Sequence, residues 1–112
     1  MPIPEHEQIT AILLAQEYAL AEKYKICSTE QIPWTVSLNQ LVHHVENNGF
    51  PGTWVHEKEG SADGIYILKR GSEHVLFEQE RGEVRYKKEF RNKRSAIISV
   101  LEEHYLVGKT IK

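Results

Sequence analysis

Cysteine is almost absent from this chain, since Cys27 is the only one among 112 residues and has no partner for an internal bridge. Small folds that depend on disulfides carry several cysteines that pair with one another. A disulfide framework is therefore excluded, and an apolar core must hold the fold. A lone thiol is typical of a reducing compartment, so we expect a cytoplasmic protein.

Long apolar runs are missing as well. Nowhere do about 18 apolar residues follow one another, the length that a membrane-spanning helix needs. The opening segment Met1–Glu7 has neither the basic start nor the apolar stretch of a secretory signal. We therefore expect no membrane partner.

Strong net charge is also missing, because the formal net charge is only −2. A balance so near zero does not by itself indicate a nucleic acid or an anionic membrane as partner. The distribution is uneven, however: residues 1–62 carry three Lys and Arg against eight acids (3 − 8 = −5), and residues 63–112 carry eleven against eight (11 − 8 = +3). The hydrophobic share of 40% is that of an ordinary globular chain, and the length fits one domain, residues 1–112.

No known catalytic or metal-binding spacing occurs. His43 and His44 are neighbours on an expected helix and point about 100° apart, whereas a helical zinc pair needs i, i+4 spacing. Gly108–Thr110 resembles the end of a phosphate loop, but the required earlier glycine is replaced by Glu103. Cys27 has no flanking nucleophile signature. We therefore predict a protein that is not an enzyme, with no catalytic residues, metal or cofactor.

Helical periodicity dominates the first half. Apolar residues at steps of three and four predict one helix from Glu5 to about Lys25. Ser37 and Gln40 have the spacing of a capping box, which predicts the start of a second helix. Asn47–Gly49 is typical of a helix end with a left-handed residue.

Strand-like alternation replaces this pattern from Thr53 onward. Short turns separate four segments, and because a parallel crossover needs a dozen or more residues, we expect antiparallel neighbours throughout. Asn92 is the expected cap of a last helix that runs to about Val107. The predicted fold is α+β, with two N-terminal helices, an antiparallel β-meander of three to four strands, and a C-terminal helix packed on the sheet, all helices lying on one side of it. The predicted strands are Thr53–Lys58, Gly64–Lys69, His74–Glu80 and Glu83–Phe90.

The segment from Arg85 to Arg94 is the most basic part of the chain. Six Lys and Arg are interleaved there with Tyr86 and Phe90, a composition that can hold single-stranded nucleic acid. Tyr86 and Phe90 have the parity of Val84, however, so we expect all three to face the core. A solvated edge strand is then the favoured interpretation, and a nucleic-acid-associated regulator that uses residues 85–94 is the alternative.

The C-terminal half carries a family resemblance. The segments Gly64–Leu68 and Val75–Glu83, followed by Phe90 and the helix Asn92–Leu106, resemble the small immunity proteins that bacteria pair with polymorphic or contact-dependent growth-inhibition toxins. The Glu-x-Glu-Arg-Gly-Glu turn at 78–83 is the most distinctive part. The resemblance implies a cytoplasmic, non-enzymatic inhibitor that binds its cognate toxin domain tightly, often by covering the active site.

An acidic surface would suit such a partner. A toxin that acts on nucleic acid presents cations to phosphates, so an opposing acidic surface raises association rate and specificity. A tryptophan is a frequent anchor at the centre of an interface, although core packing is the alternative for Trp34 and Trp54 alike. A salt-bridged, solvated sheet face is the alternative for the glutamates. The candidate partner-binding residues are Glu57, Glu59, Asp63, Glu78, Glu80, Glu83 and Trp54.

Overall fold

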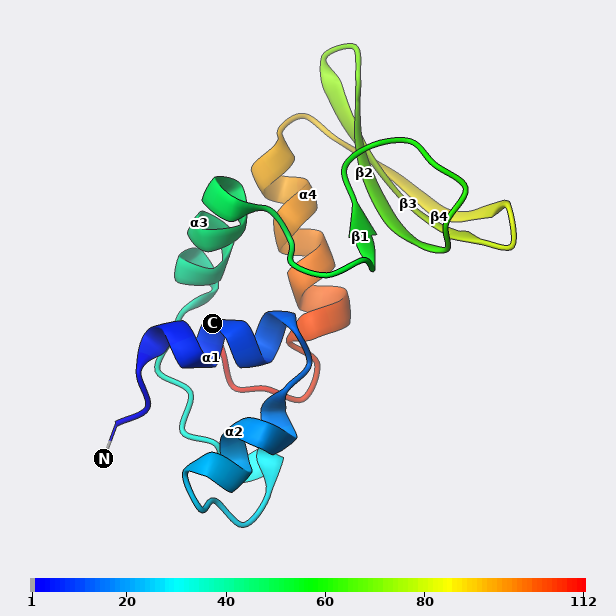
Figure 1. Ribbon diagram of the computed structural model, residues 1–112. Coiled ribbons are helices and arrows are strands. Elements are labelled where there is room, and N and C mark those ends of the chain that lie inside the picture. The colour runs from blue at the N-terminus through cyan, green and yellow to red at the C-terminus, as the bar shows by residue number, and fades with distance from the viewer. Residues whose placement is uncertain (1) are drawn as a thin grey trace.

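The computed structural model describes residues 2–112, which form an elongated molecule of 47 × 27 × 21 Å. The first two helices lie at one end and the sheet at the other, with two further helices between them (Figure 1). In chain order the elements are α1 (Glu5–Leu13), α2 (Glu17–Lys23), the 3₁₀ turn η1 (Thr29–Gln31), α3 (Leu38–Asn48), β1 (Val55–His56), β2 (Gly64–Arg70), β3 (Glu73–Glu80), β4 (Glu83–Phe90), α4 (Lys93–Val100) and the π-helical turn η2 (Leu101–Tyr105).

The predicted first helix is divided in two. Ala15 adopts a φ of +53°, and the amide of Gln16 donates to the carbonyl of Ala11 at 2.8 Å, which closes α1 in the manner of a left-handed C-terminal cap. The prediction of one continuous helix is therefore wrong. Apolar periodicity cannot detect this break, because Ala15 is itself a good helix former. After the break, α2 buries Leu20 and Ala21 in a second, smaller core cluster.

The second predicted helix is confirmed as α3. Ser37 Oγ accepts from the Gln40 amide at 3.1 Å, and Gln40 Oε1 accepts from the Ser37 amide at 2.8 Å, so the capping box is complete. Gly49, with a φ of +76°, follows the last helical residue.

One buried amide ties the helical end together. Gln8 on α1 is fully buried, and its Nε2 donates to the Ile3 carbonyl and to Thr35 Oγ1, both at 2.8 Å. Its Oε1 accepts from the Thr35 amide at 2.8 Å and from the Val36 amide at 3.4 Å. Because every polar atom has a partner, this network fixes two extended segments against α1 without leaving an unsatisfied group.

The sheet has the order β1-β2-β3-β4, and the meander β2-β3-β4 is antiparallel as predicted. The expectation that all neighbours are antiparallel is wrong for β1, which pairs in parallel with β2 through Val55↔Ile65 and His56↔Tyr66. A seven-residue return, 57–63, suffices because β1 is only two residues long and the chain need travel back only a short distance.

The returning loop covers the sheet face that α4 does not. Tyr66 points into it, with its hydroxyl donating to the Ala62 carbonyl at 2.6 Å, and its ring stacks between His56 and Phe77 at centroid distances of 4.6 and 5.1 Å. Tyr66 is thereby fully buried. Both faces of β2 are therefore covered, one by the helix and one by the loop.

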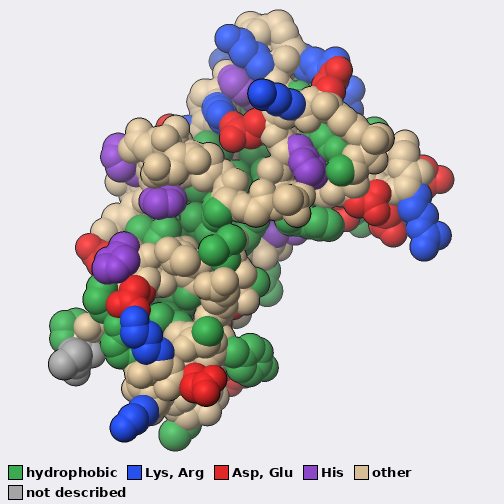
Figure 2. Space-filling view, in the orientation of Figure 1, with side chains coloured by type: hydrophobic (Ala, Val, Ile, Leu, Met, Phe, Trp, Pro, Cys, Tyr) green, Lys and Arg blue, Asp and Glu red, His purple; other side chains and the backbone are tan. Residues whose placement is uncertain are grey.

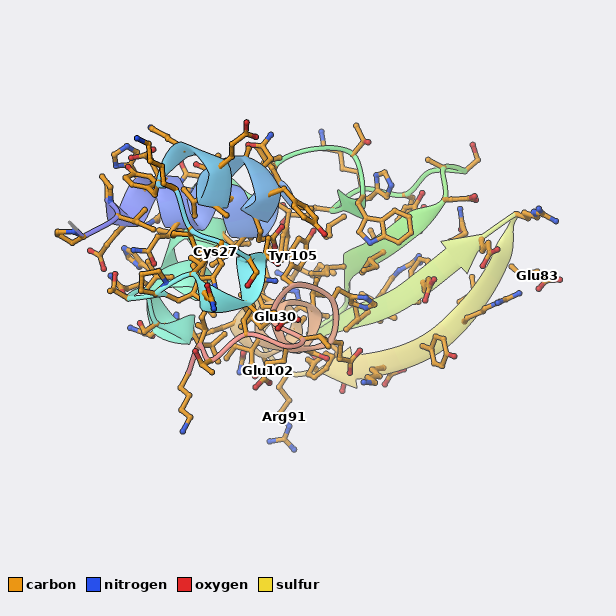
Figure 3. The ribbon with its side chains drawn as sticks, turned by 90° about the horizontal axis from the view of Figure 1, so that it is seen from below. Cys27, Glu30, Glu83, Arg91, Glu102 and Tyr105 are labelled. Carbon is orange, nitrogen blue, oxygen red and sulfur yellow. The ribbon has the colours of Figure 1, made fainter. Side chains whose placement is uncertain are left out.

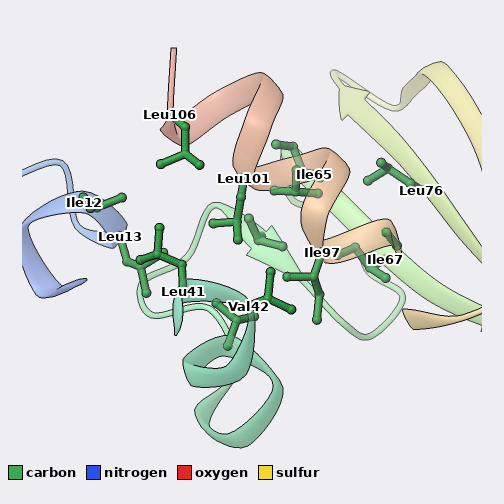
Figure 4. Packing of buried hydrophobic residues seen from close by; sticks show 14 of the residues in the cluster. Ile12, Leu13, Leu41, Val42, Ile65, Ile67, Leu76, Ile97, Leu101 and Leu106 are labelled. Atoms are coloured by element: carbon green, nitrogen blue, oxygen red, sulfur yellow. The ribbon is translucent and has the colours of Figure 1, made fainter. Parts of the chain in front are cut away.

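The C-terminal helix packs on the sheet, as predicted. Asn92 caps α4 by accepting from the Ser95 amide at 2.8 Å. The buried face of α4 continues into η2 and lies between the sheet and α3 (Figure 4). The further expectation that all helices lie against the sheet is wrong, because α3 packs on α4 and the first two helices are at the far end (Figure 1). The fully buried residues of this face are Ala96, Ile97, Val100 and Leu101.

We expect Gly64→Ala to destabilise the fold by at least about 2 kcal/mol, measured by chemical denaturation. Gly64 has a φ of +140°, and an added Cβ would lie 2.3 Å from the Trp54 carbonyl oxygen and 2.9 Å from His56 Nε2. Gly60→Ala is the matched control, because its Cβ would make only ordinary contact at 3.6 Å with the Tyr66 hydroxyl. Equal stability of the two variants would contradict the close β1–β2 approach.

Candidate functional site

Two of the predicted acidic residues are neutralised by long-range ion pairs. Glu57 pairs with Lys93 at the start of α4, and Glu59 pairs with Arg70 at the end of β2. Both carboxylates therefore connect the 57–63 loop to neighbouring elements. They add little net negative charge to the surface.

The acids around the β3–β4 turn are also held within the molecule. Arg85 lies 3.5 Å from Glu80 and 3.6 Å from Glu83, which Figure 3 places at the tip of the hairpin. Asp63 Oδ1 accepts from the Arg81 backbone amide at 2.9 Å and so fastens the turn to the preceding loop. Acidic and basic side chains accordingly lie side by side at the hairpin end (Figure 2). For these residues the interpretation as a salt-bridged, solvated face agrees with the contacts.

Glu78 differs from the other predicted acids. It is half-buried, stands opposite Ile65 on β2, and has no cationic partner within residues 2–112. It lines a cavity of about 250 Å³ between the hairpin and the end of α4, which we call the Glu78 pocket. The lining residues of the Glu78 pocket are Ile65, Leu76, Phe77, Glu78, Tyr86, Lys88, Glu103 and His104.

A β-bulge in β4 forms one wall of this pocket. The register passes from Leu76↔Lys88 to Glu78↔Arg85, so Tyr86 and Lys87 together oppose Phe77. Tyr86 takes a φ of +52° at this position.

The bulge also overturns a prediction about the core. We expected Val84 and Tyr86 to be buried, but they are 55% and 76% exposed, because the bulge interrupts the alternation and every residue of β4 before Phe90 is exposed. Phe90, beyond the bulge, does pack against the main core.

The π-helical turn η2 supplies the opposite wall. The Leu106 amide donates to the Leu101 carbonyl at 2.9 Å, five residues back, and the widened turn presents Glu103 and His104 to the pocket. Lys88 pairs with Glu103, and this contact holds the pKa of the Glu103 carboxyl below its ordinary value. Ser99 Oγ donates to the same carboxylate at 3.5 Å.

A second hollow lies beside the first and contains Trp54. Trp54 is 48% exposed and Leu14 40% exposed, so the core alternative is wrong for Trp54. Trp34, by contrast, is half-buried and packs against both core clusters. The hollow has a volume of about 420 Å³, and we call it the Trp54 groove. The lining residues of the Trp54 groove are Ile12, Leu13, Leu14, Ala15, Glu17, Pro51, Gly52, Thr53, Trp54, His104, Tyr105 and Lys109.

The two hollows meet at His104, which lines both. Tyr105, which also borders the Trp54 groove, lies between the helical end and the sheet (Figure 3). Together the Glu78 pocket and the Trp54 groove form what we call the contact face. It offers an apolar floor, exposed aromatic rings and the Glu78 carboxylate, which has no cation partner among residues 2–112. This is the chemistry of a binding surface.

Sequence reasoning found two members of the contact face, Trp54 and Glu78, and missed most others. Leu14 belongs to an apolar stripe that predicts burial, and only the unforeseen break at Ala15 exposes it. Neither the bulge at Tyr86 nor the π turn has a residue-type signal, since no glycine marks either place.

Residues 2–112 contain no group of three or more His, Cys, Asp or Glu close enough to hold a metal ion. Within the same part of the chain, no helix combines the length and apolar character required to cross a bilayer. Cys27 is an exposed free thiol. No family model matches the chain, and neither the curated proteins nor the solved structures compared with it gave a match.

We expect Lys88→Gln to raise the pKa of Glu103 toward its ordinary value, because the cation that lowers it is removed. A lowered carboxyl pKa means that the pair stabilises the fold at neutral pH and that this stabilisation disappears as pH falls through the folded pKa. Both side chains are about half exposed, so the effect on stability is under about 1 kcal/mol. Carboxyl NMR titration measures the shift directly. Lys87→Gln is the control and leaves Glu103 unchanged; an unaltered Glu103 titration in Lys88→Gln would refute the pairing.

Proposed function

We propose that this chain is an immunity-type inhibitor that binds a cognate bacterial toxin domain through the contact face and covers its active site. The observation that carries the proposal is the adjoining pair of hollows with exposed Trp54, Leu14 and Tyr86 on their borders. Large apolar side chains exposed around a concave surface are typical of protein interfaces, and tryptophan and tyrosine are enriched among the residues that dominate binding energy.

The charge of the contact face favours a toxin with a basic surface. Glu78 lines a hollow and has no ion pair within residues 2–112, whereas Glu57 and Glu59 are already paired. A partner that carries basic residues around an active site for nucleic acid would complement it. A nuclease toxin therefore fits the proposal better than an acidic partner does.

We expect Trp54→Ala to weaken toxin binding by at least about tenfold while leaving the fold intact, because Trp54 supplies much of the exposed apolar area of the groove. The measurement is calorimetric titration against a toxin domain encoded by a gene next to the one for this chain. A second measurement is the survival of cells that express the toxin together with each variant. Tyr18→Ala is the matched control, since Tyr18 is an aromatic residue 84% exposed on α2, outside the contact face. Absence of binding by the unaltered chain, or equal effects of both variants, would refute the proposal.

A second candidate function has one specific observation in its favour. Tyr86 is exposed on β4 between Arg85 and Lys87, so a stacking ring does accompany the basic segment, contrary to the sequence expectation. Single-stranded nucleic acid could stack on such a ring and place phosphates near the cations. Against this candidate, Arg85 and Lys88 are engaged with glutamates.

If the chain binds nucleic acid, Lys87→Glu should abolish the shift of a labelled oligonucleotide, because Lys87 is exposed and has no ion pair within residues 2–112. The shift of the unaltered chain should weaken steeply with salt. Lys25→Glu, at an exposed position just after the end of α2, is the control. The nucleic-acid candidate fails if no shift occurs at low salt or if both variants bind equally.

A further inference from the structure

We propose that the Glu78 pocket receives one cationic side chain, arginine or lysine, of the partner protein. This inference rests on the proposed function for the existence of a protein partner. The chemistry of the pocket is a property of this chain alone and is argued from its lining.

The pocket has the size and polarity of a single long basic side chain. Its volume of about 250 Å³ is below the range of about 300–1,000 Å³ that is usual for small-molecule sites. Ile65 and Leu76, both buried, form an apolar floor, and Glu78 stands at its edge opposite Ile65. Arginine and lysine have an apolar stem and a charged end, which match the floor and the carboxylate in turn.

The charges in the lining leave one negative charge uncompensated. Glu78 and Glu103 contribute two formal negative charges and Lys88 one positive charge, a balance of −2 + 1 = −1. Lys88 is paired with Glu103, which also accepts from Ser99, so Glu103 is satisfied. Glu78 has no hydrogen bond or ion pair from its side chain within residues 2–112. A half-buried carboxylate beside apolar groups gains most from a cation that enters from outside.

Tyr86 adds a further reason for a cation. It lines the pocket while most of its surface remains exposed, so its ring borders the solvent side of the cavity. The face of a phenol ring attracts cations, and a planar guanidinium also stacks on it. Arginine is therefore expected to bind more tightly than lysine.

The test uses the complete chain and a defined probe. Amide NMR spectra are recorded during titration with N-acetyl-arginine methylamide and, separately, with the citrulline analogue, which has nearly the same shape without the charge. The arginine probe should cause saturable shifts that centre on the Glu78 pocket, and the citrulline probe should not saturate. Equal behaviour of the two probes, or no saturable shift with either, overturns the inference.

Two variants, each of which removes one negative charge at a different position, complete the design. Glu78→Gln is expected to weaken binding of the arginine probe by at least about tenfold, since it removes the charge-assisted contact. Glu22→Gln removes one negative charge on the exposed surface of α2, outside the pocket, and should retain the affinity of the unaltered chain. Equal weakening in both variants means general charge attraction and overturns the inference.

The outcomes separate this inference from the proposed function. Failure of the arginine probe leaves toxin binding through the Trp54 groove unaffected. Specific binding of the arginine probe, with no toxin bound by the chain, supports the pocket and rejects the inhibitor. If the toxin binds Glu78→Gln as tightly as the unaltered chain, the pocket is not used by that partner, and the inference is overturned for it.

Discussion

Burial of one face of α4 is the constraint on which the rest of the structure depends. Ala96, Ile97, Val100 and Leu101 have no exposed surface, because the sheet lies against one side of the helix and α3 against another. Removing these side chains from water is the main favourable term available to a chain without disulfides. The same burial fixes the position of η2, whose outer side chains border both hollows. The contact face is therefore positioned by a fully buried part of the core, which limits the ordering that binding requires.

The ion pairs at the sheet end of the molecule chiefly reduce the negative charge of its surface. Exposed pairs such as Glu59–Arg70 contribute at most about 1 kcal/mol each to stability. Their larger effect is that Glu57, Glu59, Glu80 and Glu83 lie beside cations of the same molecule, the last two sharing Arg85. The surface is therefore less acidic than the sequence predicts. Among the predicted acids in residues 2–112, Glu78 and Asp63 form no ion pair, and of these two Glu78 lines the pocket. Recognition of a partner by this chain would then depend more on shape and on one placed charge than on a broad field.

The parts of the fold that the sequence predicts are those specified by nearby residues. Ser37 with Gln40, and Asn92, mark helix starts by bonds that span three residues, and the alternation in β3 is visible without knowledge of its neighbours. The break at Ala15 and the bulge at Tyr86 place ordinary residues at positive φ, which only the surrounding packing can require. The site was predictable to a smaller degree for the same reason. Whether a glutamate is free depends on partners such as Lys93 for Glu57, 36 residues away (93 − 57 = 36), and no local pattern reports that.

The parallel pairing of β1 has a consequence for how the molecule moves. Only two register pairs join β1 to β2, and Val55 is the residue of segment 53–63 in the main core. The 57–63 loop is held by two exposed ion pairs, a few hydrogen bonds and the stacked ring of Tyr66. We therefore expect segment 53–63 to open locally more readily than the α4 core, and its amides to exchange with solvent hydrogen before those of β2 and β3. Since Trp54 belongs to this segment, a ligand bound in the Trp54 groove would slow that exchange. Part of the binding free energy of the ligand would then be used to hold segment 53–63 in its closed conformation.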